Sequence, residues 1–155
     1  MIRRFLAVAA MAMIFVPASC SEPLGNDAAE GDETTEVFNM KIDVKVGGRV
    51  FAATLEDNAA AREFASRLPL TLSMSELNGN EKYCYLDKPL PAAAKSVSTI
   101  ESGDLMLWQS NCVVLFYKTF SSGYSYTRLG RLDSAEGIAG AVGRGEVSVT
   151  FESRE

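Results

Sequence analysis

The residues best suited to bind or transform a ligand fall into two short stretches, a polar turn and an aromatic run. In the turn, Asn78-Gly79-Asn80 bends the backbone and exposes its amides, and Glu81 and Lys82 place opposite charges side by side. In the aromatic run, which ends at Arg128, successive rings could line a groove for an apolar or peptide ligand. The candidate ligand-binding residues are therefore Asn78, Asn80, Glu81, Tyr83, Phe120, Tyr124, Tyr126 and Arg128.

A structural interpretation of the same residues stays open. Asparagine in a hairpin turn commonly bonds local backbone groups, and rings on strands commonly pack against neighbouring strands. In that case Arg128 would serve the scaffold by pairing with a carboxylate such as Asp104 or Glu101. The residue types alone do not decide between a ligand site and a scaffold.

Composition excludes several kinds of chemistry. The chain has no histidine, which removes Ser-His and Cys-His nucleophiles and histidine metal sites. Its three cysteines include no C-x-x-C pair, so we expect no metal centre and no cofactor. The 15 basic and 20 acidic residues give a formal charge of −5, and we therefore expect no nucleic-acid partner. Cys84 and Cys112 could form a disulfide or remain two buried thiols.

Residues 1–19 predict a signal peptide. Two arginines precede an unbroken apolar run, Phe5–Val16, which is shorter than the ~20 residues of a transmembrane helix. The small residues before Cys20 resemble the lipobox of bacterial lipoproteins, although Pro17 departs from the aliphatic residue usual there. The resemblance implies that Cys20 is lipidated and anchors the chain to a membrane of the cell envelope. The alternative, ordinary secretory cleavage, also places the remaining chain outside the cytoplasm.

An acidic tether follows, so that residues 20–36 comprise the lipidated cysteine and a flexible spacer. Ser21–Glu36 contains six acids, no base and a single large aliphatic residue, Leu24. Such a segment cannot bury enough apolar surface to offset the entropy of ordering it. From residue 37 onward there are 13 basic and 14 acidic residues. The acidity of the chain therefore belongs to the tether and says nothing about a partner of the domain at residues 37–155.

The domain is predicted to be mostly β, a closed eight-stranded barrel with two short helices. One helix begins at Asp57 or Asn58 and runs through Leu68, and a second begins at a capping-box-like Asp133 and ends by Gly143. Eight strands with so few helices favour closure, which removes exposed edges. Apolar alternation, or an apolar run on both faces, predicts the strands Val37–Val46, Arg49–Leu55, Leu70–Ser75, Lys82–Leu86, Asp104–Gln109, Cys112–Lys118, Tyr126–Leu132 and Glu146–Glu152.

Three stretches resemble the bacterial and archaeal cyclophilin-like family of small β-barrel proteins. They read LPLTLSMSELNGNEKYCYL at 68–86, ESGDLMLWQSNCVVLFYKTFSSGYSYTRLGRL at 101–132, and GEVSVTFE at 145–152. The resemblance covers residues 40–152 and implies a closed eight-stranded barrel flanked by two helices. The family has no settled activity, and a shared fold does not transfer function.

Three functions therefore remain. The first is an envelope lipoprotein that displays the barrel as a binding module for a peptide or small ligand. The alternative is a peptidyl-prolyl isomerase acting on exported proteins, in which Arg128 would be the cation near the twisted amide, although no run of this sequence matches the residues that carry catalysis in true cyclophilins. The third is a purely structural envelope component. A closed pocket rimmed by Asn78 and Glu81 would favour binding, a groove floored by Arg128 would favour the isomerase, and a filled barrel without a hollow would favour structure.

Overall fold

The computed structural model describes Phe38 and residues 40–155. The predicted signal peptide, Cys20 and the acidic tether lie outside the described residues. Within the described part, no helix is long and apolar enough to cross a membrane.

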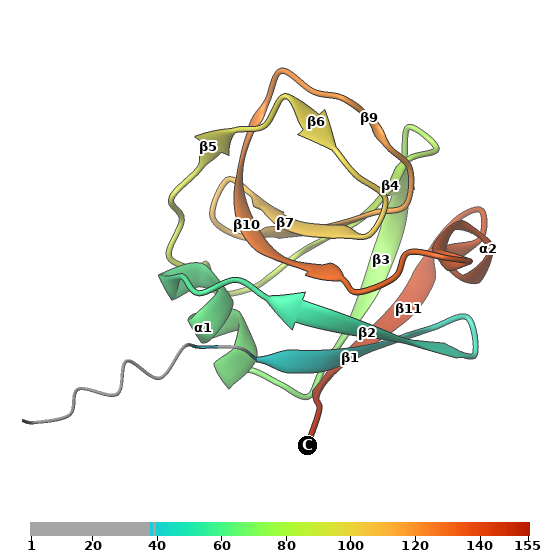
Figure 1. Ribbon diagram of the computed structural model, residues 1–155, viewed down its shortest axis with the longest axis horizontal. Helices are drawn as coiled ribbons and strands as arrows, with labels where there is room; N and C mark the ends of the chain where they lie inside the picture. Colours follow the sequence, from blue (N-terminus) through green and yellow to red (C-terminus); the bar gives the residue numbers. More distant parts are fainter. Residues whose placement is uncertain (1–37, 39) are drawn as a thin grey trace, which may run out of the picture. The chain divides into compact units, whose positions relative to one another are not determined.

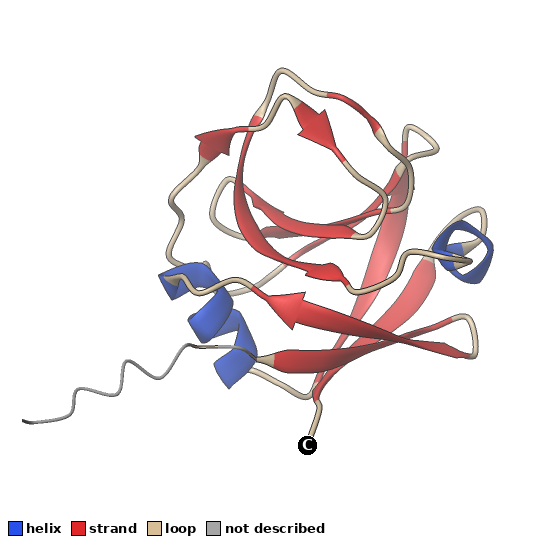
Figure 2. Cartoon of the chain, viewed as in Figure 1, coloured by secondary structure: helices blue, strands red, loops and turns tan. Residues whose placement is uncertain are grey.

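All eight predicted strands are present, each within a few residues of its expected bounds (Figure 2). Three further strands, β5 (Lys95–Ser96), β6 (Thr99–Ile100) and β9 (Phe120–Ser121), are only two residues long. The two helices are α1 (Ala59–Ser66) and α2 (Ile138–Val142). The eight longer strands are β1 (Lys41–Val46), β2 (Arg49–Leu55), β3 (Leu70–Leu77), β4 (Glu81–Tyr85), β7 (Asp104–Trp108), β8 (Cys112–Phe116), β10 (Ser125–Leu132) and β11 (Val147–Ser153).

The eight longer strands close into an antiparallel barrel (Figure 1). Their order is β2-β1-β11-β3-β4-β8-β7-β10, and β10 pairs with β2 to complete the ring. The expected closed eight-stranded barrel is thereby confirmed. β5 adds to β10, while β6 and β9 form a separate two-stranded sheet.

Local sequence signals account for the turns and the first helix. Asn78 and Gly79 have φ angles of 55° and 67°, the left-handed conformation that a tight hairpin between β3 and β4 requires. A β-carbon at Gly47, in the β1–β2 turn, would collide with the carbonyl of Ala141. Asn58 caps α1 by accepting a hydrogen bond from the Ala61 amide at 2.9 Å.

The predicted start of the second helix is wrong. α2 begins at Ile138 after Gly137, whose φ is 82°, and Asp133 makes no cap. The Asp133 carboxylate instead accepts hydrogen bonds from Thr54 Oγ1 at 2.6 Å and from Lys41 Nζ at 3.0 Å. Because the carboxylate accepts these hydrogen bonds from β1 and β2, it does not cap the backbone amides at the start of α2.

Apolar side chains fill the barrel interior. Val44, Leu107 and Leu115 are fully buried there, and Phe64 of α1 packs edge-on against Phe151, with ring centroids 5.3 Å apart. A second apolar cluster lies on the outer face of β8, β7 and β10, and it takes in residues from β6 and from the segment just after β5. The buried members of this outer cluster are Val97, Ile100, Met106, Cys112, Val114, Phe116 and Tyr126.

Candidate functional site

The alternation of side chains along β4 divides its residues between the two faces of the barrel wall. Lys82 is fully buried, and Cys84 packs against the interior core. Because successive side chains of a strand point to opposite faces, Glu81, Tyr83 and Tyr85 face outward. They lie beside the outer cluster, against which Tyr83 packs.

These outward residues form one side of a hollow of about 400 Å³, which we call the aromatic hollow. The strands β4 and β8, the ends of β7 and β10, and the segment from β9 to Tyr124 contribute to it. Seven of the eight predicted ligand-binding residues line it, and only Arg128 does not. Its lining is Leu77, Asn78, Asn80, Glu81, Tyr83, Tyr85, Trp108, Cys112, Val114, Phe120, Tyr124 and Tyr126.

The aromatic rings around the hollow contact one another in a continuous series. Trp108 lies 5.5 Å from Tyr124 and 5.3 Å from Tyr126, measured between ring centroids. Phe116, which is fully buried behind the hollow, lies 5.6 Å from Tyr126 and 5.7 Å from Phe120. Edge-to-face and tilted contacts of this kind hold the rings in fixed orientations. The wall of the hollow is therefore preorganised.

Glu81 and Asn80 supply polar atoms that the described part of the protein leaves without partners. The Glu81 carboxylate makes no hydrogen bond or ion pair with residues 38 and 40–155, and Asn80 Oδ1 is buried without a hydrogen bond. Burial, with a smaller contribution from the nearby Glu76 carboxylate, raises the pKa of Glu81 above its usual value. The hollow thus combines a ring wall with unsatisfied acceptors.

Lys82 does not stand beside Glu81 at the rim, as its neighbouring position in the sequence suggested. Its ammonium group turns to the opposite face, where it pairs with Glu76 at 2.5 Å and donates to the Gly145 carbonyl. Tyr117 also donates to Glu76, at 2.7 Å. Although burial opposes the effect, hydrogen bonds from Lys82 and Tyr117 hold the pKa of Glu76 below its usual value. Lys82 therefore leaves the charge of Glu81 uncompensated.

Arg128 belongs to a different hollow. This second hollow, of about 460 Å³, shares only Tyr126 with the aromatic hollow. The Arg128 guanidinium lies 3.6 Å from the buried carboxylate of Asp104, and its side chain is 43% exposed. The Arg128 carbonyl also accepts a hydrogen bond from Asn58 Nδ2, which connects β10 to the start of α1. Asp104 is one of the two carboxylates that the sequence suggested as partners if Arg128 serves the scaffold.

A sequence model of the cyclophilin-like family matches residues 44–152. The chain belongs to the cyclophilin-like family. Among solved structures, the chain is similar to a hypothetical protein of Archaeoglobus fulgidus determined in solution, with 21% identity and a TM-score of 0.50. That similarity covers 75% of this chain and 95% of the archaeal one, and it supports the fold alone. No curated protein matches the chain.

Both cysteines of the cyclophilin-like domain are free thiols. Cys84 packs toward the barrel interior and Cys112 toward the outer cluster, so the two side chains lie on opposite faces of the wall. Burial, with smaller contributions from Cys84 and Glu81, raises the pKa of Cys112 to about 11. A thiol with such a pKa is protonated at neutral pH and is a poor nucleophile.

Sequence reasoning missed five residues of the aromatic hollow, and for two of them, Tyr85 and Trp108, the reason is identifiable. Tyr85 follows Glu81 and Tyr83 at a spacing of two, a signal that extends the outward face of β4 by one residue. Trp108 pairs with Cys112 across the β7–β8 hairpin, at the end of an apolar strand whose pattern does not indicate a binding site. Trp108 is only partly buried, because it forms the wall of the hollow.

Proposed function

We propose that the cyclophilin-like domain is a binding module that holds a small ligand, or a short part of a peptide, in the aromatic hollow. The observation that carries this proposal is a concave site on the outer face with ring walls and unpartnered polar atoms. Its volume of about 400 Å³ falls within the range of roughly 300–1,000 Å³ usual for ligand sites. Asn80 and Glu81 would orient the ligand, and the rings would bury its apolar part.

The arrangement of the two clusters supports binding on the outside of the barrel. The interior is occupied by the main core, so a ligand there would have to displace packed side chains. On the outer face, by contrast, the rings pack against one another and leave a concavity beside them. A site of this kind needs little rearrangement to accept a ligand, which lowers the cost of binding.

A peptidyl-prolyl isomerase is the second candidate, favoured by the hollow that Arg128 and Tyr126 share. There the guanidinium could approach a twisted prolyl amide. The same guanidinium is directed to Asp104, and we rank this function second for that reason. An isomerisation assay on a proline-containing peptide tests it: a rate above background that disappears in Arg128→Ala would reverse the ranking.

We also propose that the binding module is presented on a lipid anchor at Cys20, outside the cytoplasm. The lipobox-like sequence and the acidic segment after it support this placement. Fractionation of cells that express the full chain tests it. Wild-type protein should partition with membranes and Cys20→Ala should not; wild-type protein in the soluble envelope fraction would refute the anchor.

The binding function is tested with the single tryptophan of the chain, Trp108, as a reporter inside the hollow. The full chain is purified from cell envelopes, examined for a retained small molecule by native mass spectrometry, and then freed of it. When the removed small molecule is added back to the ligand-free protein, the fluorescence emission of Trp108 should change and reach saturation. Tyr124→Ala, which alters an exposed wall residue, should weaken binding about fivefold, whereas Val50→Ala, exposed on β2, should not. A chain without retained ligand and with unchanged emission would overturn the proposal.

A further inference from the structure

We infer that the ligand of the aromatic hollow carries a protonated alkylamine, held between the ring faces and the Glu81 carboxylate. The inference rests on the proposed function, because it names the class of ligand taken by the same hollow. It follows from three properties of the hollow: its free ring faces, its charge and its hydrogen-bonding atoms.

No cation from residues 38 and 40–155 lies over a ring that lines the hollow. Six of its twelve lining residues are aromatic. Cation–π contacts do occur in the described part of the chain: Arg62 lies 4.3 Å from the Phe38 ring, Arg49 lies 5.1 Å from Phe51, and two lysines lie over Tyr117. All of these rings lie outside the hollow. Within the described residues, an ammonium group of a ligand would therefore not compete with a protein cation for the rings that line this hollow.

Among the described residues, Glu81 is the one charged residue that lines the hollow. The nearest cations in the sequence are committed elsewhere, since Lys82 pairs with Glu76 on the other face and Arg128 is directed to Asp104. Burial of a carboxylate without a counter-charge is unfavourable, because lost hydration is not replaced by an ion pair. A cationic ligand supplies that counter-charge, whereas an anionic ligand would meet repulsion.

The unpartnered polar atoms specify an amine that still bears N–H groups. The ionised Glu81 carboxylate has only acceptor atoms, so a ligand group that pairs with it has to supply donors. A primary or secondary ammonium can donate to Glu81 while its alkyl carbons lie against the rings. A quaternary ammonium offers the same charge to the rings but donates no hydrogen bond.

The inference implies a pH dependence of binding. The cation binds the ionised form of Glu81, so affinity should fall as the pH decreases through the raised pKa of that group. The other titratable groups around Glu81 are Glu76 of β3, Cys112 of β8, Tyr117 and Tyr126. Glu76 titrates below its usual range, and the thiol and phenols titrate far above neutrality, with pKa values raised to about 11 or 12. Among these groups, Glu81 is the only carboxylate whose pKa is raised by its surroundings.

The experiment compares hexylammonium, hexyltrimethylammonium, hexanol and hexanoate, which share one alkyl chain and differ in the head group. Binding to the full chain is followed by Trp108 emission and by calorimetry. We expect hexylammonium to bind most tightly and hexyltrimethylammonium more weakly. Hexanol should bind at least about tenfold more weakly than hexylammonium, and hexanoate not at all.

Variants at Glu81 and Tyr124 separate the contribution of the carboxylate charge to binding from that of an aromatic ring. Glu81→Gln should weaken hexylammonium binding at least about tenfold and abolish its pH dependence, whereas Glu136→Gln, on an exposed residue outside the hollow, should change neither. Tyr124→Leu removes a ring and should weaken binding several-fold, while Tyr124→Phe keeps the ring and should not. Circular dichroism of each variant checks that the fold is kept.

The outcomes distinguish this inference from the function on which it rests. Equal binding of hexylammonium and hexanol, or unchanged binding in Glu81→Gln, would overturn the amine and leave the hollow as a site for an uncharged ligand. Preferred binding of hexanoate would also overturn it. Failure of every probe overturns the inference as well, and the retained-ligand experiment then decides the proposed function separately.

Discussion

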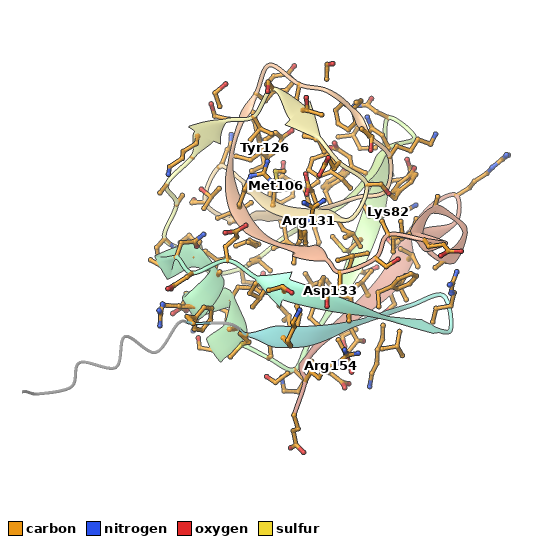
Figure 3. All side chains as sticks on the ribbon, viewed as in Figure 1. Lys82, Met106, Tyr126, Arg131, Asp133 and Arg154 are labelled. Atoms are coloured by element: carbon orange, nitrogen blue, oxygen red, sulfur yellow. The ribbon has the colours of Figure 1, made fainter. Side chains whose placement is uncertain are left out.

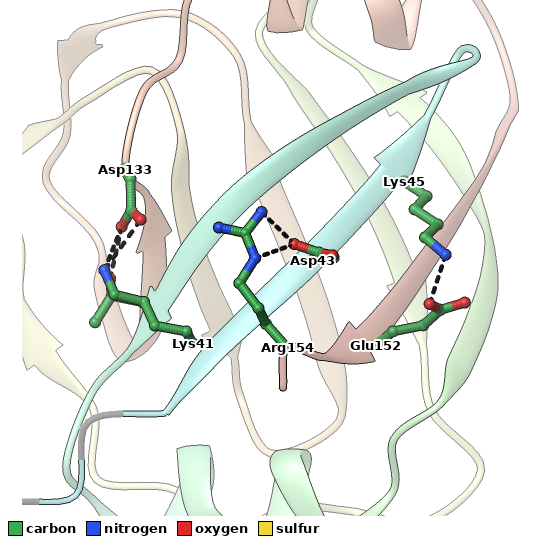
Figure 4. Close-up of polar contacts among 7 residues, drawn as sticks. Lys41, Asp43, Lys45, Asp133, Glu152 and Arg154 are labelled. Carbon is green, nitrogen blue, oxygen red and sulfur yellow. Dashed lines mark hydrogen bonds and ion pairs between the residues drawn. The ribbon is translucent and has the colours of Figure 1, made fainter.

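Two parts of the outer surface of one barrel differ sharply in what they present. The face formed by β1, β2 and β11 is covered by ion pairs (Figure 4): Lys45 lies 2.5 Å from Glu152, and Arg154 lies 2.6 Å from Asp43. The face formed by β8, β7 and β10 carries apolar side chains and rings, among them Met106 and Tyr126 (Figure 3). We call these the polar face and the aromatic face.

The difference follows from what covers each face. Along β1, buried residues alternate with lysines and an aspartate, because the outer side of this strand meets water. Along β8, all five residues are buried, because the segments that contain β6 and β9 lie over its outer side. The barrel wall thus carries a second apolar layer on the aromatic face, outside the filled core.

Carboxylates on the two faces have pKa values displaced in opposite directions. Hydrogen bonds from Thr54 and Lys41, with burial opposing them, lower the pKa of Asp133 beside the polar face. Burial raises the pKa of Glu81 beside the aromatic face. The folded state therefore favours the ionised form of the first carboxylate and disfavours that of the second.

The largest expected effect comes from removing the centre of the aromatic face. Phe116→Ala should lower the free energy of unfolding by about 3–5 kcal/mol, because the ring is fully buried against Phe120 and Tyr126. Urea denaturation followed by circular dichroism measures the change, with Val50→Ala as an exposed control. A loss below about 1 kcal/mol would mean that the outer cluster is a surface layer and not a second core.

Asp133→Asn should destabilise the protein by about 1 kcal/mol at neutral pH, since it weakens bonds to two strands at a partly exposed site. The folded-state pKa lies below the unfolded value, near 3.8. The stabilisation is therefore present above that pH and is lost as pH falls through the folded-state pKa. Urea unfolding of both proteins down to about pH 3 should show their stabilities converging; a constant difference would contradict the assignment.

Glu81→Gln should change the free energy of unfolding in the opposite direction to Asp133→Asn, and by a smaller amount. Because the folded-state pKa lies above the unfolded value of 4.5, ionisation of Glu81 costs stability. The cost is absent below pH 4.5 and grows as pH rises through the folded-state pKa. The variant should thus be more stable than wild type at neutral pH, by less than the change expected for Asp133→Asn. If Glu81→Gln destabilises the ligand-free protein, the carboxylate has a partner after all.

The smallest effect is expected from an exposed ion pair of the polar face. A double-mutant cycle on Lys45 and Glu152 should give a coupling energy of about 0.3 kcal/mol, because both side chains are well exposed to water and salt. Added salt should reduce it further. A coupling above about 1 kcal/mol would show that the polar face stabilises the barrel more than its exposure suggests.

Features set by neighbouring residues were predictable. The eight longer strands follow from alternation, the cap of α1 from Asn58, and the β3–β4 turn from Asn78-Gly79, because each depends on groups a few residues apart. The two-residue strands β5, β6 and β9 were not predicted. Two residues show no periodicity, and such strands exist only because the folded barrel supplies their partners.

The candidate site was predictable as a set of residues but not in its geometry. Seven of the eight candidates meet in one hollow, although they come from two stretches that are separate in the sequence. Arg128 lies elsewhere, beside Asp104, and Trp108 lies against Tyr124. Which partner a long side chain meets depends on the strand beside it, and strand order is a property of the closed barrel.

By itself, the sequence determined the strand pattern, the barrel class, and the absence of histidine chemistry, since these depend on residue type and local spacing. The tertiary structure alone decided which partners the charged side chains have. Lys82 lies on the inner side of the wall and pairs with Glu76. Asp133 accepts a hydrogen bond from Thr54, 79 residues away in the sequence, and does not cap a helix. Glu81 remained without a partner beside the rings of the outer face. Electrostatic pairing depends on distance in space, and only closure of the barrel sets those distances.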